Sequence, residues 1–178
     1  MLSIFLRRIA GAALLDASTY EEVEADPGGT PQAAAVVVLS SLAAGVGLSG
    51  SRGLAVSFPF FALATVLALA AWVAFALIAL QVGSRVLASP ETRVDAGELL
   101  RTLGYAAAPG LCQVFALFSP APVATSVAAF AWTMAASVVA VRQALDFTST
   151  GRALAVCVVG WGLPLAIAAT LAVVVSGG

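Results

Sequence analysis

The stretch "FPFFALATVLALAAWVAFALIALQVG", residues 58–83, decides the fold class of this chain, because it contains no charged residue. A helix needs about 20 mostly apolar residues to cross a bilayer, and this stretch is long enough. The overall composition agrees. Apolar residues make up 61% of the chain and charged residues 10%, whereas a soluble domain has roughly 45–50% and 25%. We therefore predict an integral membrane protein.

Charged residues divide the rest of the chain into similar apolar stretches. Residues 27–51 and 102–141 carry no charge, and neither does the chain after Arg152. The stretch 102–141 is too long for one helix, and the prolines of "FSPAP" (118–122) favour a turn and a new helix start within it. Period-two alternation is missing, which argues against strands. We predict an all-α bundle of five transmembrane helices within residues 30–178, with spans near 31–49, 58–83, 98–118, 122–142 and 152–175.

Residues 1–29 are predicted to form short cytoplasmic or interfacial helices. The first has an apolar face at helical spacing, formed by Leu2, Phe5, Ile9 and Ala13. Arg7 and Arg8 are placed to contact lipid phosphates. A signal peptide is the alternative, although here the basic pair follows the first apolar residues instead of preceding them. An acidic helix comes next, with Ser18 predicted as its N-cap and Asp26-Pro27-Gly28-Gly29 as its end.

The arginines predict the orientation of the bundle. All eight basic residues are arginines, and with five spans only Arg52 falls on one side of the membrane. The other side receives Arg7, Arg8, Arg85, Arg93, Arg101, Arg142 and Arg152. The positive-inside rule then places the N-terminus in the cytoplasm and the C-terminus outside.

Three stretches together suggest a family: "DASTYEEVEADPGGTPQA" (16–33), "ELLRTLGYAAAPGL" (98–111) and "AWTMAASVVAVRQALDFTSTGRALAVCVVG" (131–160). The chain resembles a prokaryotic member of the Yip family, the Ypt/Rab-interacting membrane proteins. The resemblance implies five spans, a cytosolic N-terminus and a place in the cell membrane. Eukaryotic relatives bind small GTPases and each other in vesicle traffic. This chain has only about thirty residues where those relatives carry a long cytosolic tail, which argues against binding of a small GTPase.

Two charged segments are candidates for partner binding. The first is the acidic helix, with Tyr20, Glu21, Glu22 and Glu24; it fits either a handle for a cytoplasmic protein or a solvated amphipathic helix lying on the bundle. The second is the turn between the last two predicted spans, with Arg142, Asp146 and Arg152. We predict that Arg142 and Asp146, four residues apart, share a helix face and can pair. Either this turn docks a partner, or its arginines anchor and orient the bundle.

Two predicted spans contain helix-breaking residues. The kink or cavity candidates are Tyr105, Pro109 and Gln113 in the third span and Gly160, Gly162 and Pro164 in the fifth. Carbonyl groups freed at such kinks can line a cavity, although proline and glycine also serve plain packing in membrane helices. Ser41, Gly45 and Ser49 form a ridge of small residues on the first span, which fits internal packing or an oligomer interface.

We expect no enzyme, no cofactor, no metal site and no nucleic-acid partner. The chain has no His and no Lys, and its two cysteines, Cys112 and Cys157, lie far apart. The leading hypothesis is a membrane organiser or adaptor that associates with itself or another integral membrane protein. The alternatives are transport of lipid or a small solute through the kinked third and fifth spans, and an accessory subunit of a larger membrane complex. A polar groove that joins Tyr105, Gln113, Thr133 and Arg142 would favour transport.

Overall fold

The computed structural model describes residues 2–52, 58–86 and 96–162, with only the backbone at 48–52. Every element in these ranges is a helix, which confirms the all-α prediction. The elements in chain order are α1 (Leu2–Ala13), α2 (Ala17–Glu24), the 3₁₀ turn η1 (Pro27–Gly29), α3 (Thr30–Arg52), α4 (Phe58–Gln81), the π-helical turn η2 (Val82–Val86), α5 (Ala96–Tyr105), the 3₁₀ helix η3 (Ala108–Leu117) and α6 (Pro122–Ala144). A last helix covers residues 150–162.

Three segments of the described chain are long and apolar enough to cross a membrane: Pro27–Gly47, Phe58–Val86 and Pro122–Ala144. The prediction of five transmembrane helices is therefore not confirmed. In the region predicted as the third span the chain forms α5 and then η3, because Pro109 lies at the start of η3 and cannot continue an α-helix. In the region of the fifth span only residues 150–162 are described, and Pro164 lies outside the described residues.

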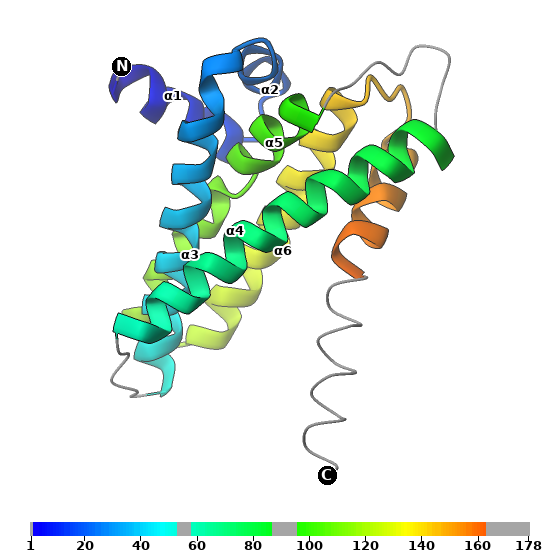
Figure 1. Cartoon of the computed structure of the whole chain (residues 1–178). Helices are drawn as coiled ribbons and strands as arrows, with labels where there is room; N and C mark the ends of the chain where they lie inside the picture. Colours follow the sequence, from blue (N-terminus) through cyan, green and yellow to red (C-terminus); the bar gives the residue numbers. More distant parts are fainter. Residues whose placement is uncertain (1, 53–57, 87–95, 163–178) are drawn as a thin grey trace.

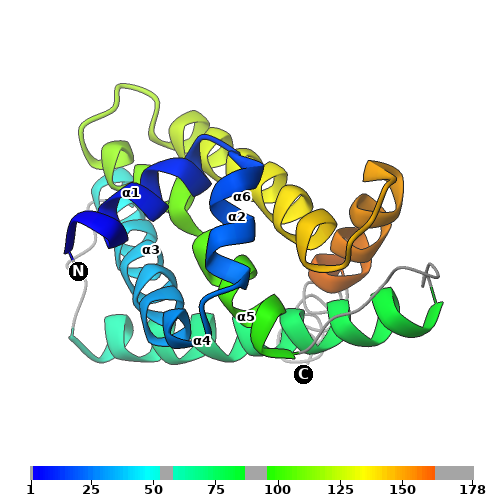
Figure 2. The ribbon, with the colours of Figure 1, turned by 90° about the horizontal axis from the view of Figure 1, so that it is seen from above.

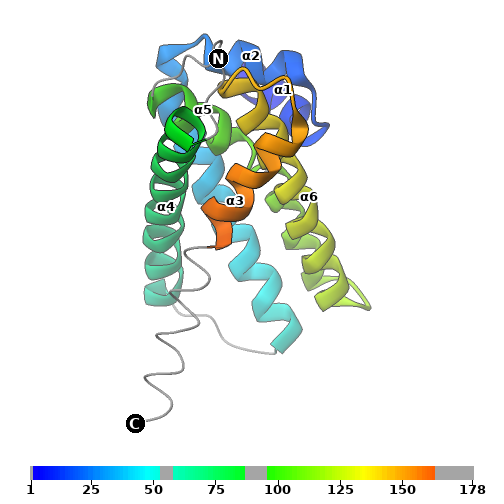
Figure 3. The same cartoon turned by 90° about the vertical axis from the view of Figure 1, so that its right-hand side faces the viewer.

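The bundle has two different ends (Figure 1). α1 and α2 lie across one end, next to the start of α3, the start of α5 and the end of α6, and α4 runs obliquely across the bundle. Seen from above, α1 and α2 cover the helices beneath them (Figure 2), and the side view places both at that same end (Figure 3). We call this end, formed by α1, α2, η1, the first turns of α5 and residues 142–152, the charged end.

The start of α2 differs from the prediction. Ser18 is not the N-cap; Asp16 is, and its side chain accepts a hydrogen bond from the Ser18 backbone N–H at 3.1 Å. Asp16 has an extended backbone (φ −74°, ψ 110°), which is the usual conformation of a capping residue. The helix therefore begins at Ala17, and the short α1–α2 connection leaves the two helices in contact.

Glycines allow α3 to approach α5 and η3 at backbone distance. A Cβ atom on Gly47 of α3 would lie 2.2 Å from the carbonyl oxygen of Gln113 in η3. A Cβ atom on Gly104 of α5 would lie 2.6 Å from the Cβ of Ala33 in α3. Such close packing supplies most of the association between membrane helices, because lipid gives little hydrophobic drive. α3 packs more extensively against η3 than against any other element.

We predict that Gly47→Ala destabilises the bundle, because its new methyl group would collide with backbone that cannot rotate away. Overpacking of this kind costs about 1–3 kcal/mol. The matched control is Gly151→Ala, at an exposed helical position where a Cβ meets nothing closer than 3.5 Å; it should leave stability unchanged or raise it by up to about 1 kcal/mol. Thermal unfolding in detergent measures both. Equal melting temperatures for the two variants would contradict the close α3–η3 contact.

Candidate functional site: the charged end and an apolar cavity

The centre of the charged end is the side chain of Arg8, which is only 8% exposed. Its Nε donates to Glu22 Oε1 at 3.0 Å and its Nη1 donates to Asp26 Oδ2 at 2.7 Å. Burial lowers the pKa of this guanidinium, but the hydrogen bonds to Asp26 and Glu22 outweigh burial and raise it. In return, Arg8 holds the pKa of both carboxyl groups below their usual range. A buried charge is tolerated only when it is paired in this way.

Arg8 therefore faces the interior of the protein. The prediction from the sequence that it contacts lipid phosphates is wrong. The apolar face of α1 packs onto the bundle around it: the ring of Phe5 lies edge-on to Tyr105, with 6.3 Å between centroids, and Ile9 contacts the buried core. The Tyr105 hydroxyl is fully buried in this packing and donates to Gln32 Oε1 of α3 at 2.7 Å. Residues from α1, α3 and α5 are thus joined at one point.

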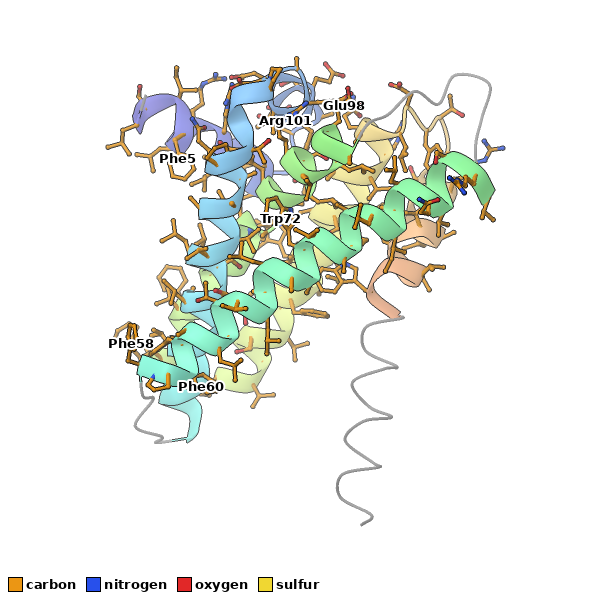
Figure 4. All side chains as sticks on the ribbon, viewed as in Figure 1. Phe5, Phe58, Phe60, Trp72, Glu98 and Arg101 are labelled. Atoms are coloured by element: carbon orange, nitrogen blue, oxygen red, sulfur yellow. The ribbon has the colours of Figure 1, made fainter. Side chains whose placement is uncertain are left out.

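A second buried arginine, Arg101 of α5, binds the C-terminal end of α2. Its Nε donates to the carbonyl oxygen of Val23 at 3.2 Å, and its Nη2 donates to that of Glu24 at 2.5 Å. These are among the last carbonyl groups of α2, which have no partner within the helix. A cation at this position also complements the negative end of the helix dipole. Figure 4 shows Arg101 and Glu98 at this end, and Phe58 and Phe60 at the opposite, apolar end.

The residues of α2 that the sequence suggested for partner binding differ in their contacts. Tyr20 is fully buried and its hydroxyl donates to the carbonyl oxygen of Ala12 at 3.0 Å, so it holds α1 to α2 and is not presented to an outside partner. Glu22 accepts from Arg8 and from the exposed Arg7. Glu21 is exposed and accepts from Gln143 Nε2 of α6 at 2.6 Å. The two segments proposed for partner binding therefore meet.

Glu24 is half-buried and lies among like charges. Burial raises its pKa to about 7, and the nearby carboxyl groups of Glu98, Asp146 and Glu21 add to this shift, while Arg101 opposes it. A carboxyl group with such a pKa changes its charge near neutral pH.

The turn after α6 does not form the ion pair predicted between Arg142 and Asp146. α6 ends at Ala144, and Asp146 has a φ of 50°, in the left-handed region. The two residues therefore do not share a helix face, and Arg142 Nε donates to the carbonyl oxygen of Phe147 at 3.3 Å instead. Arg142, Asp146 and Arg152 are all exposed, and none of them forms an ion pair with any residue that the structure describes.

An apolar cavity of about 500 Å³ lies between α3, α4, α5, η3, α6 and the helix at 150–162. Its volume falls within the roughly 300–1,000 Å³ of typical small-molecule sites. The side chains of Phe60 on α4 and Phe130 on α6 line it and are also 44% and 46% exposed, so the cavity opens between these two helices. Small residues of α4 that line the cavity, such as Ala64 and Ala68, leave the space unfilled.

The predicted polar groove is only partly assembled. Gln113 and Thr133 line the cavity, whereas Tyr105 and Arg142 do not. Tyr105 is bonded to Gln32, and Arg142 belongs to the turn at the charged end. The structure therefore gives no continuous polar path through these four residues.

Gly160, Ser41 and Gly45, among the remaining kink and packing candidates, make close contacts between helices. Pro109 lies in the first turn of η3. A Cβ atom on Gly160 would lie 2.2 Å from the Phe75 ring, so the helix at 150–162 touches α4 there. Among the described residues, Gly162 has nothing within 4 Å of such an atom. Ser41 and Gly45 face α4, where the Ser41 and Thr65 hydroxyl groups are 3.4 Å apart and Gly45 packs on Phe61. The side chain of Ser49 lies outside the described residues.

The sequence indicates no site role for Gln32, Arg101 or Trp161, and it assigns Arg8 to lipid phosphates and not to a buried ion pair. The scarcity of charge was a usable signal for the two arginines, because a charge that cannot reach water needs a partner. Arg8 has acidic residues 14 and 18 positions later, at Glu22 and Asp26. No local pattern points to Trp161, whose role depends on the helices around it.

The sequence profile of the Yip1 domain matches residues 14–172 of the chain. The matched region includes α2, all the membrane-length helices and the cavity, and it begins after α1. No curated protein and no solved structure matches the chain.

We predict that Arg8→Gln releases α1 and α2 from the bundle, because Glu22 and Asp26 lose their shared partner. The expected loss of unfolding free energy is roughly 2 kcal/mol, the value of hydrogen bonds to a charged, mostly buried group. Hydrogen exchange of residues 2–26 measures the release. Arg7→Gln is the matched control, since Arg7 is 62% exposed and contacts Glu22 alone; it should cost at most about 0.5 kcal/mol. If both variants exchange alike, Arg8 does not hold the two helices.

We also predict that the charged end becomes more stable as the pH falls from 8 to 5. The pKa of Glu24 is about 7 in the fold, above its ordinary value of 4.5, so between these two pH values the folded state binds more protons than the unfolded state, and stability is lost as the pH rises through this range. Solvent screening limits the effect to about 1 kcal/mol. Glu22 and Asp26, whose pKa values are lowered, titrate below this window. Melting curves measured at each pH give the dependence of stability on pH. This dependence should disappear in Glu24→Gln, and if it remains unchanged another group is responsible for it.

Proposed function

This chain belongs to the Yip1 domain family, and we propose that it is a multi-pass membrane organiser or adaptor of the Yip type. It acts by associating with itself or with other membrane proteins, and it is not an enzyme. It resides in the cell membrane with its charged end in the cytoplasm and its C-terminus outside. Small GTPases are not among the proposed partners.

The proposed topology has five crossings. α3, α4 and α6 supply three of them, and the segment beginning at residue 150 supplies the last. The remaining crossing is the broken segment of α5 and η3, with 10 residues in each. α5 rises about 15 Å and η3 about 20 Å, and these rises together exceed the roughly 30 Å of the hydrocarbon core.

The observation that carries the adaptor proposal is the contrast between two sets of arginines at the charged end. Arg8 and Arg101 are 7% exposed each and hydrogen-bonded within the fold. Arg142 and Arg152 are exposed and form no ion pair with the described residues. Arg8 and Arg101 hold the helices of the charged end together. Arg142 and Arg152, together with Asp146, are then available to bind a partner of complementary charge. Complementary charges of this kind favour selection and rapid encounter of a partner.

A second contact surface is the outward face of α4, which meets membrane lipids or a neighbouring membrane helix. Its large exposed residues are Leu63, Val66, Leu67, Val73 and Leu77. This helix is the most apolar of the candidate membrane segments, and only 17% of its central window is buried. Such a face suits lateral association within a membrane.

The test is association of the chain in its own membrane. Two differently tagged copies are expressed together, extracted in mild detergent and analysed by co-purification and native mass spectrometry. We predict a bound second copy, or one stoichiometric membrane protein, and a loss of about tenfold or more in the double variant Arg142→Gln/Arg152→Gln; tenfold corresponds to about 1.4 kcal/mol.

The matched control is Arg7→Gln/Arg85→Gln, which removes two exposed arginines from the same predicted side of the membrane. This control should keep the association. A wild-type chain that always purifies alone would contradict the adaptor function. Equal losses in the two double variants would show that total charge, and not the turn after α6, supports association. A set of several fixed partners would indicate an accessory subunit of a larger complex.

A further inference from the structure

The indole N–H of Trp161 is buried in the wall of the apolar cavity and has no hydrogen-bond partner among the residues that the structure describes. Its ring is held between two aromatic side chains: Phe75 of α4 at a centroid distance of 5.1 Å and Phe130 of α6 at 6.2 Å. The contact of Gly160 with Phe75 fixes the backbone next to it. The indole therefore cannot easily turn its N–H toward another acceptor.

Four other polar side chains of the cavity lining are hydrogen-bonded within the fold. The indole N–H of Trp72 donates to the carbonyl oxygen of Leu100 at 3.0 Å. The hydroxyl groups of Ser41, Thr133 and Ser137 each donate to a carbonyl oxygen of their own helix. Trp161 thus differs from Trp72, the other tryptophan of the lining, in having a free donor.

A buried donor without a partner is costly, by roughly 1–3 kcal/mol in proteins and more in hydrocarbon. Native folds seldom keep such a group unless something binds it. Water is a poor candidate here, because it needs two to four polar partners and the walls around Trp161 are mainly aromatic and aliphatic. The occupant therefore carries an acceptor for Trp161 and an apolar body for the rest of the cavity.

We propose that this cavity binds a fatty-acyl chain whose carbonyl oxygen accepts a hydrogen bond from Trp161 Nε1. The mouth between Phe60 and Phe130 faces the surroundings of the bundle, which in a membrane are acyl chains. Such chains match the apolar lining, and their carbonyl group supplies the acceptor. The chain is either part of a glycerophospholipid or a free fatty acid, which share this chemistry. The site is a ligand site separate from the charged end and from the adaptor function.

Photo-crosslinking of the full-length protein in lipid nanodiscs tests the site. One probe is a fatty acid with a diazirine in its chain, and the other is a phosphatidylethanolamine that carries the same diazirine acyl chain. We expect saturable labelling of residues 58–75 and 122–141, reduced by unlabelled competitor. Labelling by the phospholipid probe identifies a bound membrane lipid, and labelling by the fatty-acid probe alone identifies a free acid; both support an acyl-chain site. Labelling that grows linearly with probe, as for bulk lipid, would overturn it.

Two pairs of variants test the assigned contacts. Trp161→Phe keeps the aromatic ring and removes the donor, so the labelling affinity should fall about two- to tenfold, as for loss of one hydrogen bond. Trp132→Phe is its control and should leave the affinity unchanged, because Trp132 of α6 is 40% exposed and does not line the cavity. Ala68→Phe fills the cavity and should abolish saturable labelling, whereas Ala70→Phe, at an exposed position on the same helix, should not.

Melting temperatures establish that each variant is folded before its labelling is compared. The proposal is overturned if Trp161→Phe binds as tightly as the unchanged protein. It is equally overturned if Ala68→Phe and Ala70→Phe are labelled alike.

Discussion

The pairing of a buried cation is the interaction on which the charged end depends. Arg8 lies where water cannot solvate it, so the fold must bring carboxylate groups to it. Glu22 and Asp26 meet this requirement within 3.0 Å. They can do so only if α1 folds back over α2 and η1. The same contacts place Phe5 on Tyr105, and Tyr105 in turn holds Gln32 of α3. One constraint therefore sets the relative positions of α1, α2, η1, α3 and α5.

Charge is scarce in this chain, and the structure divides its arginines between two tasks. Arg101 satisfies carbonyl groups at the end of α2, and Arg8 pairs with carboxylates. Both are buried, so they stabilise the fold and cannot serve a partner directly. Arg142 and Arg152 stand on the same end and remain exposed. This division makes a stable surface that displays free charge, which is the physical basis of the adaptor proposal.

The broken segment α5–η3 shapes the interior of the bundle. Pro109 starts a 3₁₀ helix, and Gly47 and Gly104 let α3 approach this segment at backbone distance. Opposite that tight contact, the alanines on the inner face of α4 leave a cavity. Close packing on one side and small residues on the other thus produce a bundle that is dense near η3 and hollow near Trp161.

The sequence by itself determined the membrane class, the helical fold and the family, because these follow from composition, apolar length and stretches such as "YEEVEADP" and "GYAAAPG". The sequence also located α2 and its C-terminal end before α3, but it did not identify the N-cap residue of α2, which is Asp16. Only the tertiary structure decided which groups meet: Arg101 with Glu24, 77 residues apart, and Gln143 with Glu21, 122 residues apart. It also left the indole N–H of Trp161 without a partner among the described residues. The reason is physical. Helical periodicity is a local property that a sequence displays directly, whereas pairing and cavities depend on distances between helices that local patterns do not encode.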